Sequence, residues 1–190
     1  MSKGYSGLFS GTSGASVNSS YLTDSSDVES YSERGIDIPE HIKEYLSKLQ
    51  HKGDYITGSV DDFSMTDVSV MSKETGVEFA HVTVGSTTYL IRGDVKGTVI
   101  PYNLLNQMEK KGGTWDYHSH PHNDDLVPSQ TDMELLGILG RTTGQRESTI
   151  VTPNGMTSTF SKDGVISTGT VSNSINEDRR KALLELFGGK

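Results

Sequence analysis

The pair His118 and His120, followed by Pro121 and by Ser129-Gln-Thr-Asp132, constrains this chain more than any other part of its sequence. On an extended strand, residues two apart point to the same face of the sheet, so both imidazoles can bind one metal ion. Pro121 cannot donate a hydrogen bond to a neighbouring strand and is expected to end this one. Asp132 would be the third protein ligand, which leaves a fourth tetrahedral position for water, as in catalytic zinc sites. The sequence therefore predicts a metal centre at the end of a strand.

Ser129 and Asp132 also have a structural interpretation. Ser-x-x-Asp directly before an apolar run is typical of a capping box, with Ser129 as the N-cap of a helix over residues 129–140. The two interpretations are compatible, because a carboxylate on the first turn of a helix is well placed to reach an ion at a strand end. Since paired histidines also occur on strands without a metal, the prediction depends on the whole set of residues.

Taken together, these residues resemble the signature of the JAMM (JAB/MPN) metalloproteases, in which an upstream Glu precedes His-Ser/Thr-His, seven residues and Ser-x-x-Asp. Here eight residues separate His120 from Ser129, so the intervening loop must bulge. The resemblance covers about residues 77–160. It implies an α/β (α+β) fold of the cytidine-deaminase-like JAB/MPN architecture, with a curved, mainly antiparallel mixed sheet flanked by helices. It also implies one Zn²⁺ ion per chain, bound by His118, His120 and Asp132.

The upstream glutamate of this signature corresponds to Glu78. The sequence predicts a strand over residues 77–84, and Gly85 follows Glu78 seven residues later, as in the family. Glu78 shares a face of that strand with apolar residues, which is unusual because burial of an unpaired carboxylate is costly. Glu74 is the alternative, since a Glu-x-Gly start also occurs in such strands, and an ion pair at a strand edge is the structural alternative for Glu78. The resemblance implies that Glu78 is the general base and that Ser129 donates a hydrogen bond to the oxyanion.

Other polar residues near the motif are not expected to be central to the site. His81 falls on the opposite face of its strand from Glu78 and is not expected to be a ligand. His122 is either a fourth ligand that closes the site or a solvent-exposed residue, and the turn at Pro121 favours exposure. Asp116 or Asp124 is expected to orient one of the metal-binding histidines.

The remaining periodicities predict further helices and strands. Helices are expected over residues 39–50, 103–110 and 174–187. Strands are expected over 87–92, 113–120, 148–152, 157–160 and 165–168, the last three as an antiparallel meander. Residues 54–73 are polar and weakly patterned, and no element is assigned to them.

Composition limits the organisation of the chain, which has 190 residues. A single domain is expected over residues 37–190. Residues 1–36 are rich in Ser and Gly and predict a flexible arm or linker. They resemble segments that join C-terminal modules of bacterial polymorphic toxins and prophage-associated proteins to larger parents.

The net charge of −8 and the pI near 5.2 argue against a nucleic acid or an anionic membrane as the partner. There is no cysteine, which excludes disulfides and thiolate zinc ligands. No apolar run reaches transmembrane length and no signal-peptide pattern opens the chain. We therefore expect a cytoplasmic protein, or one exported without a cleavable signal peptide.

The resulting prediction is a zinc-dependent peptidase or isopeptidase that acts on a protein or peptide substrate, such as a ubiquitin-like protein or a cell-wall peptide. The main alternative is a non-catalytic scaffold or interaction module of the same fold. A His-x-His amidohydrolase barrel would need about 250 residues. Such metal hydrolases would also use further histidines downstream, and none follows His122.

Overall fold

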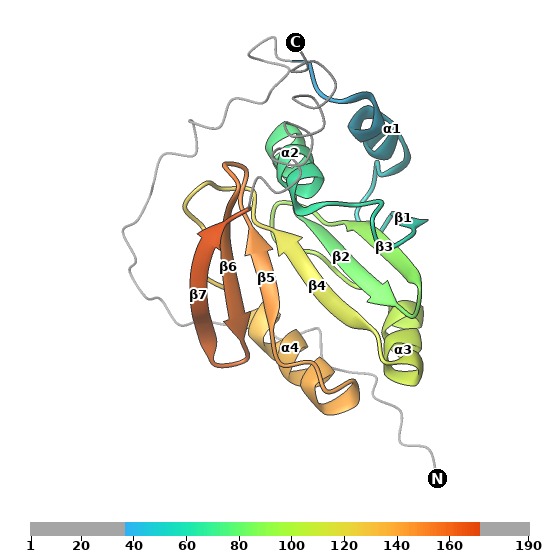
Figure 1. Cartoon of the computed structure of the whole chain (residues 1–190), viewed down its shortest axis with the longest axis vertical. Helices are drawn as coiled ribbons and strands as arrows, with labels where there is room; N and C mark the ends of the chain where they lie inside the picture. Colours follow the sequence, from blue (N-terminus) through green and yellow to red (C-terminus); the bar gives the residue numbers. More distant parts are fainter. Residues whose placement is uncertain (1–36, 172–190) are drawn as a thin grey trace, which may run out of the picture.

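The computed structural model describes residues 37–171, and the predicted arm over residues 1–36 and the predicted helix over 174–187 lie outside this range. Within it, seven strands form one sheet in the order β1-β3-β2-β4-β5-β6-β7 (Figure 1). The strands are β1 (Tyr55–Gly58), β2 (Phe79–Val84), β3 (Thr87–Arg92), β4 (Thr114–Ser119), β5 (Ser148–Val151), β6 (Met156–Ser161) and β7 (Gly164–Thr170). Neighbouring strands pair antiparallel except β4 and β5, which are parallel. The predicted α/β class with a mainly antiparallel mixed sheet is confirmed.

Four helices of the described range cover the two faces of this sheet. They are α1 (Glu40–Lys48), α2 (Met65–Thr75), α3 (Tyr102–Lys111) and α4 (Gln130–Thr142). Figure 1 shows α1 and α2 on one side of the sheet and α3 and α4 on the other. No helix in the described part of the chain is long and apolar enough to cross a membrane.

Each helical layer closes a separate hydrophobic core. Leu104 and Met108 of α3 and Leu136 of α4 pack with the sheet residues of one face. Ile42 of α1 and Met71 of α2 pack with the residues of the other face. The three layers follow from the need of each amphipathic helix to bury its apolar stripe against the sheet.

The segment over residues 54–73, to which the sequence analysis assigned no element, contains β1 and most of α2. Ser64 and Asp67 form a capping box at the start of α2. Ser69 and Ser72 face inward, and their hydroxyls donate to the main-chain oxygens of Thr152 and Val77. These buried serines interrupt the apolar period, which explains why the pattern failed to reveal the helix.

A β-bulge in β4 decides which of its side chains share a face. His118 pairs with Ala80 of β2 and Trp115 pairs with Val82, so Asp116 is the extra residue in the register. As a consequence Trp115 and His118 lie on the same face although they are three residues apart. Their rings stack with centroids 4.6 Å apart.

Candidate metal centre

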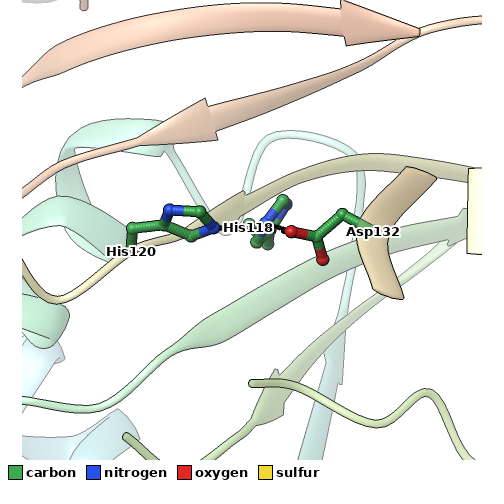
Figure 2. A group of neighbouring side chains, drawn as sticks. All are labelled: His118, His120 and Asp132. Carbon is green, nitrogen blue, oxygen red and sulfur yellow. Dashed lines mark hydrogen bonds and ion pairs between the residues drawn. The ribbon is translucent and has the colours of Figure 1, made fainter. Parts of the chain in front are cut away.

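The two histidines and Asp132 meet where β4 ends and α4 begins (Figure 2). His118 is the penultimate residue of β4, His120 directly follows the strand, and Asp132 lies in the first turn of α4. The Nε2 atoms of His118 and His120 are 3.1 Å apart. Oδ2 of Asp132 lies 3.5 Å from Nε2 of His118 and 3.6 Å from Nε2 of His120. The structure therefore brings the three predicted ligands together.

These distances suit a tetrahedrally coordinated metal ion. Three ligand atoms at about 2.1 Å from a tetrahedral ion are spaced about 3.4 Å from one another. The three donor atoms form a nearly equilateral triangle of this size, and both histidines are at most 4% exposed. The group of His118, His120 and Asp132 could hold a metal ion.

The start of α4 fixes the carboxylate of this group. Oγ of Ser129 accepts a hydrogen bond from the Asp132 N–H, and Oδ2 of Asp132 accepts from the N–H and the hydroxyl of Ser129. The predicted capping box is present, with Ser129 as N-cap. Burial raises the pKa of Asp132, but its hydrogen bonds with His118 and His120 outweigh burial and hold the pKa well below its ordinary value. The capping box therefore forms although the loop before Ser129 is one residue longer than in the JAMM signature.

The ring of His120 is oriented by a residue that the sequence analysis missed. Its Nδ1 lies 3.0 Å from the main-chain oxygen of Asp125 and 3.2 Å from Oδ2 of the same residue. A hydrogen bond from Nδ1–H to these oxygens directs Nε2 to the ligand group. Burial lowers the pKa of His120, but hydrogen bonds with Asp125 and Asp132 and the charge of Glu78 raise it to about 10.

The prediction that Asp116 or Asp124 plays this part is wrong. The carboxylate of Asp116 bonds to His81 instead, and the partner of His120 is Asp125, the neighbour of Asp124. Sequence reasoning could not choose between consecutive aspartates in an irregular loop, because no periodicity there says which side chain turns inward.

Aromatic rings pack against His118. It is fully buried, and its ring stacks on Trp115 and meets the edge of Phe160. Its Nδ1 has no hydrogen-bond partner among the described residues. Burial lowers the pKa of His118, which favours the neutral form that binds a metal.

Glu78 lies directly before β2 and shares a cleft of 390 Å³ with His120, Ser129 and Asp132. Its side chain is buried, and burial, opposed by the charge of His120, raises its pKa to about 7. The hydroxyl of Thr98 lies 3.5 Å from its carboxylate. The competing Glu74 lies in the last turn of α2. Of the two glutamates considered from the sequence, Glu78 is the one that lines the cleft.

The register of the sheet explains this position. Ala80 pairs with His118 at the end of the antiparallel β2–β4 ladder, and Glu78 and His120 each lie two residues beyond this last pair. The pairing of β2 with β4 therefore brings Glu78 and His120 to the same end of the two strands, where both line the cleft.

His81 and His122, the other two histidines near the motif, lie at different places in the structure. His81 lies on the opposite face of the sheet, as expected, where its Nδ1 is 2.9 Å from the carboxylate of Asp116 and its ring stacks on Tyr117. His122 lines the cleft but is exposed. Within residues 37–171, the ligand group comprises His118, His120 and Asp132 without a further histidine.

The fold and the site define an α/β protein with a buried His–His–Asp group at the edge of a cleft. No protein-family model, no curated protein and no solved structure matches the chain.

Proposed function

We propose that this chain is a zinc-dependent peptidase or isopeptidase of the JAMM type, with the JAB/MPN architecture. One observation carries the proposal: a separate buried carboxylate, that of Glu78, opens onto the same cleft as His120 and Asp132 of the ligand group. Two imidazoles and one carboxylate are ligands that zinc favours, and three protein ligands leave a position for water. The resemblance of the sequence motif to the JAMM signature supports the same assignment.

When bound, zinc supplies a Lewis acid that polarises the scissile carbonyl and lowers the pKa of a water molecule from 15.7 toward about 7. Glu78 takes the proton of the attacking water and passes it to the nitrogen of the leaving amine. An acid with a pKa near neutrality suits both steps, because it can accept and release a proton at the same pH. The buried carboxylate of Glu78 lines the same cleft as His120 and Asp132, where the reacting atoms would lie.

Ser129 is proposed to stabilise the oxyanion of the tetrahedral intermediate. Its hydroxyl donates to Oδ2 of Asp132, while its Oγ accepts from the Asp132 N–H. Rotation about the Cβ–Oγ bond redirects the proton to a substrate oxygen and leaves the bond from the main chain of Asp132 in place. Removal of one oxyanion donor in another hydrolase costs about 2.7–4 kcal/mol of transition-state stabilisation.

The substrate class that fits this chemistry is a protein or peptide with an accessible amide bond. Both a ubiquitin-like protein joined through an isopeptide bond and a cell-wall peptide present such a bond. The experiment therefore needs more than one probe.

Two measurements test the proposal in sequence. Elemental analysis of the purified protein is expected to show one zinc per chain, with loss of the metal in His120→Ala. The zinc-loaded protein is then incubated with isopeptide-linked diubiquitin, with cell-wall cross-bridge peptides and with a proteome-derived peptide library, and new termini are identified by mass spectrometry. Hydrolysis that falls to a small residual rate in Glu78→Gln, which keeps its zinc, supports the peptidase. Zinc binding without hydrolysis of any probe would leave the non-catalytic scaffold as the better description.

A further inference from the structure

The side chain of Ser119, between the two histidines, bonds to the first residue of β2, which directly follows Glu78. The Phe79 N–H donates a hydrogen bond of 2.9 Å to Oγ of Ser119. Both residues are fully buried, so water cannot replace this bond. Phe79 is the residue directly after Glu78, and Ser119 is the residue directly before His120.

This bond stands where the regular pairing of the two strands ends. The β2–β4 ladder runs from Thr83 opposite Thr114 to Ala80 opposite His118. Beyond that point the main chain of His120 bonds to β5, through Val151. Glu78 bonds to the other side, since its N–H donates to Asp94 and its oxygen accepts from Gly93. The two strands thus turn to different neighbours at the level of the cleft, and the Ser119 hydroxyl holds them together there.

We infer that Ser119 is a positioning residue that sets the distance between the Glu78 carboxylate and the ligand group. The inference rests on the proposed function, in which Glu78 must reach a water molecule beside His120. The Ser119 side chain touches neither substrate nor metal in this role, and it acts by holding the main chain of Phe79. A small displacement of a catalytic group is costly, since a misplacement of about 1 Å can lower a rate 100-fold.

The test compares Ser119→Ala with Ser119→Thr, which keeps the hydroxyl, and with Ser148→Ala as the matched control. Ser148 is also buried, and its hydroxyl donates to the main-chain oxygen of Trp115 at the opposite end of β4. Zinc content and circular dichroism establish that each variant is folded and loaded. Ser119→Ala is expected to keep one zinc per chain and to lower kcat about 10- to 100-fold with KM unchanged. Ser119→Thr is expected to restore kcat, and Ser148→Ala to leave it unchanged.

A double-mutant comparison separates positioning of Glu78 from a general loss of structure. In a Glu78→Gln background, Ser119→Ala should lower the residual rate no further, because the group that it positions is already missing. An equal loss of rate in both backgrounds would overturn the inference, as would a full kcat in Ser119→Ala.

Amide hydrogen exchange tests the inference even without a substrate. In the zinc-loaded Ser119→Ala protein the Phe79 amide should exchange faster than in the original chain, and Ser119→Thr should restore its protection. Unchanged exchange at Phe79 overturns the inference whether or not the protein hydrolyses a probe. Absence of hydrolysis by the unaltered, zinc-loaded protein is the separate failure of the proposed function.

Discussion

Glu78 is the residue on which the chemistry proposed for the cleft depends most, because its carboxyl group carries the proton. It is 9% exposed and lines the same cleft as His120. Burial raises its pKa from 4.5 to about 7, so the folded protein holds this proton more tightly than the unfolded chain does.

This shift predicts a pH dependence of stability in the metal-free protein. Because the folded pKa is the higher one, the stabilisation is complete below pH 4.5 and is lost as the pH rises through about 7. The Glu78→Gln variant lacks this loss. The free energy of unfolding of the variant minus that of the original chain should therefore increase by up to about 3 kcal/mol between pH 4.5 and pH 8. Urea unfolding in the presence of a chelator measures the difference at both pH values.

Gly93 is the residue whose backbone holds Glu78 from the side of β3. Its N–H donates to the Glu78 main-chain oxygen at 2.7 Å. A Cβ at this position would lie 2.6 Å from the main-chain oxygen of Gly97 and 2.7 Å from Oγ1 of Thr98. Gly93→Ala should therefore displace this loop and cost about 1–3 kcal/mol of stability, measured by urea unfolding.

Gly137 in α4 is the matched glycine for that experiment. A Cβ there meets nothing closer than 3.9 Å. Since alanine loses less backbone freedom in a helix than glycine, Gly137→Ala should stabilise the protein by about 0.5–1 kcal/mol. A destabilisation of similar size in both variants would contradict the argument from steric space.

At the scale of the elements, β4 and α4 place the ligands. The capping box sets the Asp132 carboxylate at the start of α4, and the bulge at Asp116 turns His118 and Trp115 to one face. The Asp116 carboxylate bonds to three side chains of β2 and β4, those of His81, Thr83 and Thr114. The bulge is thus held from the face of the sheet opposite to the ligand group.

Asp116→Ala should loosen this bulge and thereby disturb the position of His118, which lies two residues further along β4. The loss of the carboxylate leaves both ring nitrogens of the buried His81 without a partner, which should cost about 1–3 kcal/mol of stability. Zinc affinity, measured by competition with a chelator, should fall as well, because Trp115 no longer holds the His118 ring. Asp163→Ala in the exposed turn between β6 and β7 is the control and should change neither quantity. An unaltered zinc affinity in Asp116→Ala would show that the bulge does not position His118.

At the scale of the whole molecule, the cleft is assembled from segments far apart in the chain. Its walls come from Glu78 before β2, the loop over residues 95–98, His120 and the loop that follows β4, and the first turn of α4. The three layers in Figure 1 keep these segments together. A ligand that joins β4 to α4 should consequently stabilise the whole domain.

Zinc is therefore expected to raise the melting temperature of the protein. At a free concentration 100-fold above Kd, binding to the folded state alone contributes about 2.7 kcal/mol. The shift, followed by differential scanning calorimetry, should vanish in His120→Ala. It should persist in His51→Ala, whose side chain is 83% exposed, and in Glu78→Gln, because neither residue is a ligand. A shift that survives in His120→Ala would place the zinc elsewhere.

Local sequence was sufficient for much of this architecture. The alternation of apolar residues predicted β2, β3 and the meander of β5 to β7, and Ser-x-x-Asp predicted the start of α4. These features depend on neighbours within a few residues, for which side-chain periodicity and capping chemistry are direct signals. The same signals failed for α2, because the inward-facing Ser69 and Ser72 find hydrogen-bond partners that are distant or irregular.

The sequence by itself determined which residues have the chemistry of a metal site: two histidines at strand spacing and an aspartate at a helix start. Tertiary structure decided which other side chains lie beside these three residues. The pairing of β2 with β4 brings Glu78 to the same end of the two strands as His120, and the loop after β4 turns Asp125 rather than Asp124 toward that ring. Strand register and loop conformation are set by packing across the whole sheet, so no local pattern encodes them.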